Sequence, residues 1–120
     1  MSPLADDSDV PPYVFSMLRN LYEIERKLGL HGDPGNAGRN VQRIRELLAE
    51  LELFYEDPLG QSFDETRTDL EATLSGPAAT ELVVVEVIRP IIRRGTRASS
   101  HVVQKGVVVV RAPPHDGQVA

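Results

Sequence analysis

The apolar residues of the chain change their spacing once, and this change constrains the fold more than any other feature. Through most of residues 12–56 they recur every three or four positions, which is the period of one face of an α-helix. From Gln61 onward they alternate with polar residues or form β-branched runs, which is typical of β-strands. Two helices followed by strands predict an α+β chain with a small antiparallel sheet.

Two amphipathic helices are expected, over residues 12–29 and 37–56, with a turn around Asp33-Pro34-Gly35 between them. The apolar stripes are Val14, Met17, Leu21, Ile24 and Leu28 in the first helix and Val41, Ile44, Leu48, Leu51 and Tyr55 in the second. These stripes can pack on the chain's own sheet. They can also form half of a dimeric four-helix bundle.

Three strands are expected, over residues 70–74, 81–89 and 101–111. The sequence Arg94-Gly95-Thr96 predicts a hairpin turn between the last two, and Gly106 predicts a bulge. A simple alternation in the middle strand would bury Val83, Val85 and Val87 and leave Val84 less buried.

The charges are divided unequally along the chain. Residues 1–88 carry 7 basic and 17 acidic side chains, whereas residues 89–120 carry 6 basic and 1 acidic. The basic stretch includes Arg89, Arg93, Arg94, Arg97 and Lys105. It is either a solvated sheet edge or a contact surface for an acidic protein. Nucleic acid is the least favoured partner, because all aromatic residues precede the basic stretch and the isoelectric point is about 5.1.

No residue pattern indicates an enzyme. The chain has no Cys, so it has no thiolate metal site, disulfide or Cys nucleophile. Its three His residues (His31, His101 and His115) are far apart, and no nucleotide-binding or nucleophile motif is present. Asp64, Glu65 and Asp69 form an acidic turn that favours backbone capping over binding of a hard cation. We therefore expect no catalytic residue, metal or cofactor.

The first residues lack an apolar run, and no apolar stretch approaches the roughly 20 residues that span a bilayer. We therefore expect a cytoplasmic protein without a membrane contact.

Four stretches, in their order and spacing, resemble the GrpE family, the nucleotide exchange factors of DnaK-type chaperones. They are LRNLYEIERKLGL, VQRIRELLAELELFYEDPLGQSFDETRTD, TDLEATL and ELVVVEVIRPIIRRGTRASSHVVQKGVVVV. Together they cover about residues 13–111, and Gly60, Phe63 and Asp64 match the family's Gly-x-x-Phe-Asp connection. The family's long paired N-terminal helix has no counterpart in the sequence, and Pro90-Ile91 replaces a common Gly-Tyr. The chain therefore resembles a divergent, N-terminally short member.

The resemblance implies a homodimeric co-chaperone of protein folding and the stress response. Residues 1–12 would be a flexible lead, 13–60 the helical dimerisation region, 61–111 the β-domain and 112–120 a disordered tail. The ten stripe residues would form the dimer interface. Arg89, Arg93, Arg94, Arg97 and Lys105 would contact the nucleotide-binding domain of the chaperone and promote release of ADP. The alternative is a dimeric scaffold that keeps the fold without exchange activity.

Overall fold

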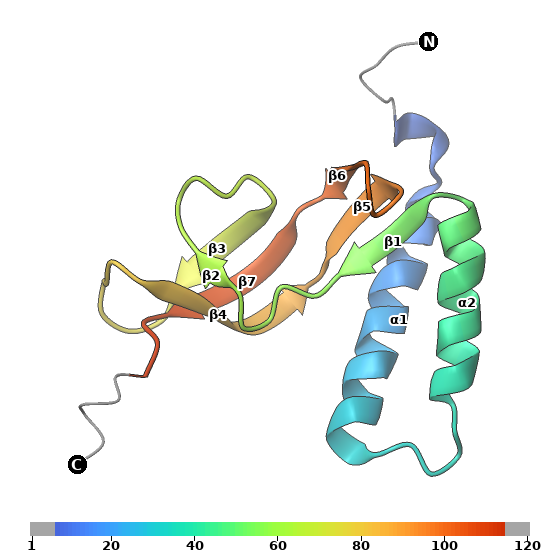
Figure 1. Cartoon of the computed structure of the whole chain (residues 1–120), viewed down its shortest axis with the longest axis horizontal. Coiled ribbons are helices and arrows are strands. Elements are labelled where there is room, and N and C mark those ends of the chain that lie inside the picture. Colours follow the sequence, from blue (N-terminus) through green and yellow to red (C-terminus); the bar gives the residue numbers. More distant parts are fainter. Residues whose placement is uncertain (1–6, 115–120) are drawn as a thin grey trace. The chain divides into compact units, whose positions relative to one another are not determined.

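The computed structural model describes residues 7–114, and the chain is α+β (Figure 1). Its helical elements are the 3₁₀ helix η1 (Asp7–Asp9), α1 (Pro12–His31) and α2 (Gly38–Glu50). Its strands are β1 (Leu53–Glu56), β2 (Ser62–Phe63), β3 (Leu70–Leu74), β4 (Leu82–Arg89), β5 (Ile91–Gly95), β6 (Ser100–Gln104) and β7 (Gly106–Arg111). Residues 1–6 and 115–120, parts of the expected lead and tail, lie outside the described residues.

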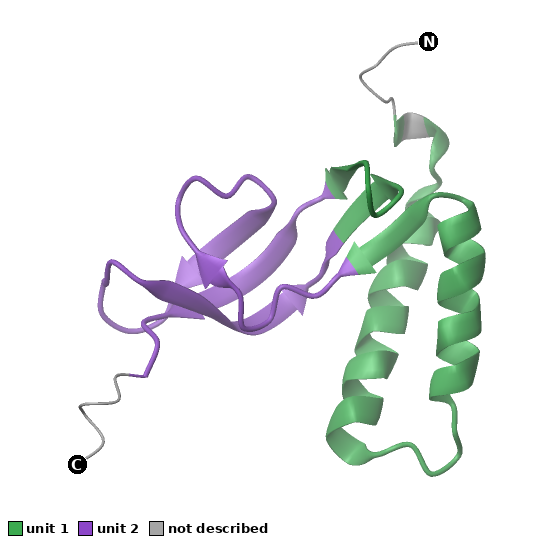
Figure 2. Ribbon diagram, in the orientation of Figure 1, with its two compact units in different colours: residues 1–55, 92–103 green, residues 56–91, 104–120 purple. Residues whose placement is uncertain are grey.

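The chain divides into two compact units (Figure 2). Unit 1 contains the residues up to Tyr55 together with Ile92–Val103, and unit 2 contains Glu56–Ile91 and the residues from Gln104 onward. A single boundary near residue 60 was expected, but the chain passes between the units three times. The basic stretch therefore contributes to both units.

In unit 1, α1 and α2 lie side by side and are joined by a short loop (Figure 1). The carboxylate of Asp33 caps α2 by accepting hydrogen bonds from the backbone N–H groups of Ala37 (2.6 Å) and Gly38 (2.8 Å). Arg45 of α2 pairs with Glu25 of α1 at 3.1 Å. The predicted Asp-Pro-Gly loop therefore also supplies the side chain that caps the start of the second helix.

The second helix is shorter than expected, because it ends at Glu50 and residues 53–56 form β1. Glu52 adopts a left-handed conformation with φ of 60°, which a helix cannot continue through. Leu53 and Tyr55 are then buried in alternation. Tyr55 follows Leu51 by four residues, which suggested one continuous helix, but Leu51 lies in the exposed turn after α2 and Tyr55 is a buried residue of β1.

Strands β1, β5 and β6 form a three-stranded sheet in this order. The N–H of Gly95, the last residue of β5, donates to the carbonyl of Glu52 just before β1 (2.7 Å). The expected turn at Gly95 lies slightly later, because Thr96 and Ser99 exchange backbone hydrogen bonds of 2.9 and 3.2 Å across it. Gly95 has φ of +127°, and a Cβ atom there would collide with the carbonyl oxygen of Ser99.

Unit 2 contains a four-stranded sheet in the order β2-β4-β7-β3. Strand β3 pairs with β7 in parallel, from Leu70 opposite Gly106 to Leu74 opposite Val110. The expectation of a wholly antiparallel sheet was therefore wrong, and the sheet is mixed. The expected strand 101–111 is divided at Lys105, and β7 begins at Gly106, where a Cβ atom would lie 2.9 Å from the side chains of Ile91 and Leu70.

The burial expected along β4 is right for Val87 and wrong for the other three valines. Val84 and Val87 are buried (1% and 4% exposed), whereas Val85 is 43% exposed and Val83 is half-buried. The register with β7 shifts between Val84 and Glu86 and again after Val87. Each shift marks a bulge-like irregularity, which breaks the two-residue alternation and leaves the buried side chains three residues apart.

This register makes a direct prediction for two neighbouring valines. Val84→Ala should lower the free energy of unfolding by about 1–3 kcal/mol, because it removes buried methyl groups and leaves a cavity. Val85→Ala, at an exposed position, should change it by about 0.5 kcal/mol or less. Urea unfolding of the two variants measures both values, and a larger loss for Val85→Ala would contradict the register.

Candidate functional site

The hairpin formed by β5 and β6 carries three of the five predicted chaperone-binding residues. Arg93 and Arg94 lie on β5, and Arg97 lies in the turn that follows. Arg97 is exposed, whereas Arg93 and Arg94 are half-buried. The other two predicted residues belong to unit 2: Arg89 ends β4, and Lys105 lies between β6 and β7, both with exposed side chains.

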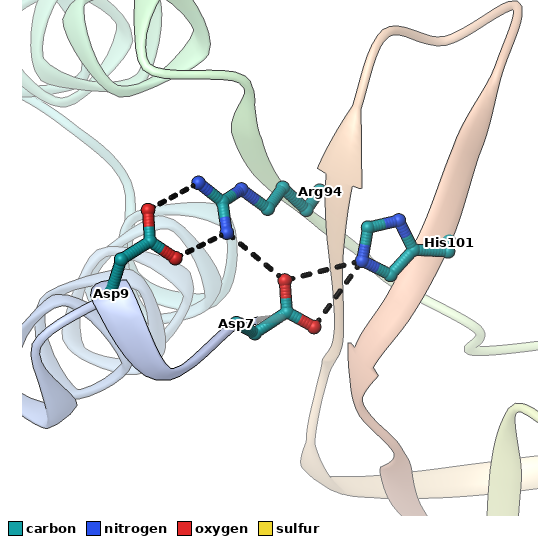
Figure 3. Close-up of polar contacts among 4 residues, drawn as sticks. All are labelled: Asp7, Asp9, Arg94 and His101. Carbon is teal, nitrogen blue, oxygen red and sulfur yellow. Dashed lines mark hydrogen bonds and ion pairs between the residues drawn. The ribbon is translucent and has the colours of Figure 1, made fainter. Parts of the chain in front are cut away.

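Arg94 is held by two carboxylates from the start of the chain (Figure 3). Its Nη1 and Nη2 atoms donate to the two carboxylate oxygens of Asp9 at 2.8 and 2.9 Å, a bidentate pair. Its Nη1 also donates to Oδ1 of Asp7 at 3.1 Å. Arg94 is therefore not a solvated side chain of a sheet edge, because two carboxylates of the same chain pair with it.

Asp7, Asp9, Arg94 and His101 form one polar cluster, in which Asp7 also contacts the second strand of the hairpin. The Nε2 atom of His101, on β6, lies 3.2 and 3.3 Å from the two carboxylate oxygens of Asp7 (Figure 3). Arg94 and His101 thus share one carboxylate. The sequence predicted no role for His101, and in the structure this side chain contacts an acid.

The two acids are presented by a short turn. The backbone N–H of Val10 donates to the carbonyl of Asp7 (3.0 Å), which closes η1 and brings Asp7 and Asp9 to Arg94 together. Val10 is buried, with 8% of its surface exposed. Pro11 is extended, with ψ of 141°, and Pro12 begins α1, where its missing N–H costs no helix hydrogen bond. The described part of the expected flexible lead is therefore an anchored turn.

The pairing of Asp9 with Arg94 favours the charged forms of these two side chains. The pKa of Asp9 lies below its ordinary value, chiefly because its carboxylate accepts hydrogen bonds from Arg94. The pKa of Arg94 is raised, first by the hydrogen bond to Asp9 and then by the one to Asp7. The contact between Asp9 and Arg94 is therefore a pair of a carboxylate and a guanidinium.

Arg97 is positioned in a different way. Its guanidinium lies over the ring of Phe54, 5.5 Å from the ring centroid, as that of Arg45 lies over Tyr55 at 5.0 Å. These four residues also line a cavity of about 290 Å³ in unit 1. Arg97 has no carboxylate partner among residues 7–114, so its charge is available at the surface.

The acidic turn after β2 behaves as a capped turn. Asp64 accepts hydrogen bonds from the backbone N–H (2.8 Å) and the hydroxyl of Thr66, and these bonds lower its pKa. Arg67 holds Asp69 through two hydrogen bonds of 3.0 and 2.8 Å. No group of three His, Asp or Glu side chains within residues 7–114 is arranged to hold a metal ion, and His115 lies outside that range.

The ten predicted dimer-interface residues divide into two sets. Val14, Leu21, Val41, Leu48 and Tyr55 are buried within the chain itself. Met17, Ile24, Ile44 and Leu51 are 43%, 42%, 41% and 63% exposed, and Leu28 is half-buried. Three of the exposed side chains, Met17, Ile24 and Ile44, line an apolar groove together with Tyr13 and Leu21 among others. One part of each stripe thus faces the core and another part faces outward.

Comparison of the chain with models of known protein families, with curated proteins and with solved structures finds no match. None of the helices in the described part of the chain is long and apolar enough to cross a membrane. The function is therefore inferred from the residues and geometry of the chain itself.

The ion pair of Asp9 predicts a specific dependence of stability on pH. Because the pKa of Asp9 is lowered in the folded protein, its stabilising effect is present above the ordinary pKa and is lost as the pH falls through the folded value. Asp9→Asn should therefore lower the melting temperature by more at pH 7 than at about pH 3, below the ordinary pKa of Asp, where protonation begins to remove the charge of Asp9.

Thermal unfolding of both proteins at the two pH values measures this. Glu65→Gln removes an exposed carboxylate elsewhere and should not change the melting temperature at neutral pH. A destabilisation by Asp9→Asn that is equal at both pH values would show that the charge of Asp9 is not the cause.

Proposed function

We propose that the chain is a GrpE-like nucleotide exchange factor that acts as a homodimer on a DnaK-type chaperone. The observation that carries this proposal is the order of the elements. Two adjacent helices with an exposed apolar stripe precede strands that lead into a basic hairpin without internal carboxylates. The sequence resemblance implies the same general order, with helices first and strands after them.

The proposed mechanism needs no covalent chemistry. The protein binds the nucleotide-binding domain of the chaperone more tightly when the nucleotide cleft is open than when it is closed. The population then shifts toward the open form, and ADP dissociates. A tenfold difference between the two affinities corresponds to about 1.4 kcal/mol of bias toward the open form.

The chaperone contacts are assigned to the exposed basic residues. Arg89, Arg97 and Lys105 have exposed side chains and no carboxylate partner among residues 7–114. An acidic surface on the chaperone can therefore pair with them without displacing an existing ion pair. Arg94, although also predicted, is engaged by Asp7 and Asp9.

Dimerisation is proposed through the outward part of the helix stripes. Met17, Ile24 and Ile44 line a common groove and remain about two-fifths exposed in the single chain. A helix face of this kind is covered when the helix pairs of two copies form a four-helix bundle. The buried members of the two stripes, such as Leu48, would then pack within each chain and would not belong to the dimer interface.

The alternative proposal is a dimeric scaffold that has the same fold and no exchange activity. The observation that favours it is the engagement of Arg94, because part of the basic surface is neutralised within the chain. The two proposals share the dimer and differ only in the chaperone contact.

The exchange activity is tested by stopped-flow release of a fluorescent ADP analogue from a DnaK-type protein, with and without the chain. The wild type should accelerate release. The double variant Arg89→Glu, Lys105→Glu should lose the acceleration, because an attraction to carboxylates becomes a repulsion. Its melting temperature should stay near that of the wild type, because both side chains are exposed.

Arg39→Glu is the matched control, because Arg39 is exposed at the start of α2, far in sequence from the basic stretch. It should accelerate release as the wild type does. Full acceleration by the double variant would remove Arg89 and Lys105 from the contact surface. No acceleration by the wild type would favour the scaffold.

A further inference from the structure

The hairpin of β5 and β6 is already in contact with another segment of the same chain. Asp7 and Asp9 lie 87 and 85 residues before Arg94 in sequence, yet both contact its guanidinium. Residues 87–115 contain no Asp or Glu, so every carboxylate that pairs with this hairpin must come from elsewhere in the chain or from another molecule. The turn at Asp7–Val10 shows what kind of segment fits.

Three features of the contact act together as recognition chemistry. Asp9 meets the planar fork of Arg94 with two parallel hydrogen bonds, a geometry that favours a carboxylate over other acceptors. Asp7 bridges Arg94 and His101, which fixes a second carboxylate two residues away. Val10 follows directly and is buried. The segment that occupies the hairpin is therefore an Asp-x-Asp turn that a buried aliphatic residue follows.

The contact is also weak enough to be exchanged. The side chain of Asp9 is 64% exposed and that of His101 is 44% exposed, so water and salt screen both pairs. The segment stays in place because it is tethered through α1, which gives it an effective concentration on the order of millimolar. A segment of the same chemistry on another protein competes with it directly.

We propose that the hairpin around Arg94 and His101 is a recognition surface for an acidic Asp-x-Asp-aliphatic turn of a partner protein. The chain's own Asp7–Val10 turn occupies this surface until the partner displaces it. If the chain is an exchange factor, the same turn also keeps Arg94 from the chaperone, and this consequence rests on the proposed function. The recognition of the acidic turn itself does not.

Protein NMR tests the competition with the full chain and without a chaperone. An acetylated peptide of residues 7–12 (DSDVPP) is titrated into the ¹⁵N-labelled wild type and into the Asp7→Asn, Asp9→Asn variant, while the amide signals of Arg94 and His101 are followed. The variant should bind the peptide at least tenfold more tightly than the wild type, because its internal occupant has lost both charges. A peptide with Asn at both Asp positions should bind neither protein.

Two further measurements keep the test decisive. In the wild type, saturating peptide should shift the amide signals of Asp9 and Val10, because the internal turn is displaced. Adding Arg94→Gln to the double variant should abolish peptide binding, and the spectrum reports whether the fold is kept. Equal affinity of the wild type and the double variant, or equal binding of the Asn peptide, would overturn the proposal. Failure of the ADP-release assay alone would leave it standing.

Discussion

Burial of aliphatic side chains is the constraint on which the rest of the structure depends. Aromatic residues make up only 5% of the sequence, so Leu, Ile and Val must build the cores of two compact units within 120 residues. In unit 1 the core includes Leu18, Leu21, Val41, Leu48 and Ile92, and in unit 2 it includes Leu70, Val84, Val87, Val108 and Val110. Units of this size bury a smaller fraction of their surface than larger domains do. Apolar residues such as Met17 and Ile44 consequently remain at the surface.

Local periodicity predicted the elements well and their details poorly. The helices over 12–31 and 38–50 and the strands around 70–74, 82–89 and 106–111 follow from spacing that each segment carries by itself. Strand β1 was missed because four residues cannot distinguish a period of two from the end of a helix, and β2 and β5 were also not predicted. The bulges in β4 and the parallel pairing of β3 depend on partner strands, so no pattern within either strand reports them.

The candidate site was predicted in part for the same reason. The absence of carboxylates between residues 87 and 115 drew attention to the basic stretch, and three of its arginines do lie on one hairpin. The pairing of Arg94 with Asp7 and Asp9 joins residues more than 80 positions apart, and local rules do not relate such positions. The one available signal was complementary charge, since an acidic run near the start of the chain matches a basic stretch near its end.

The proposed exchange factor and the proposed scaffold both depend on the claim that the outward part of the helix stripes pairs two copies of the chain. Multi-angle light scattering at micromolar concentration tests this most directly. The wild type and the Arg39→Glu control should have about twice the 13.2 kDa mass of one chain. Ile44→Asp, which places a charge in the proposed apolar seam, should have the mass of one chain and keep its helical circular dichroism. A wild type with the mass of one chain would contradict the claim.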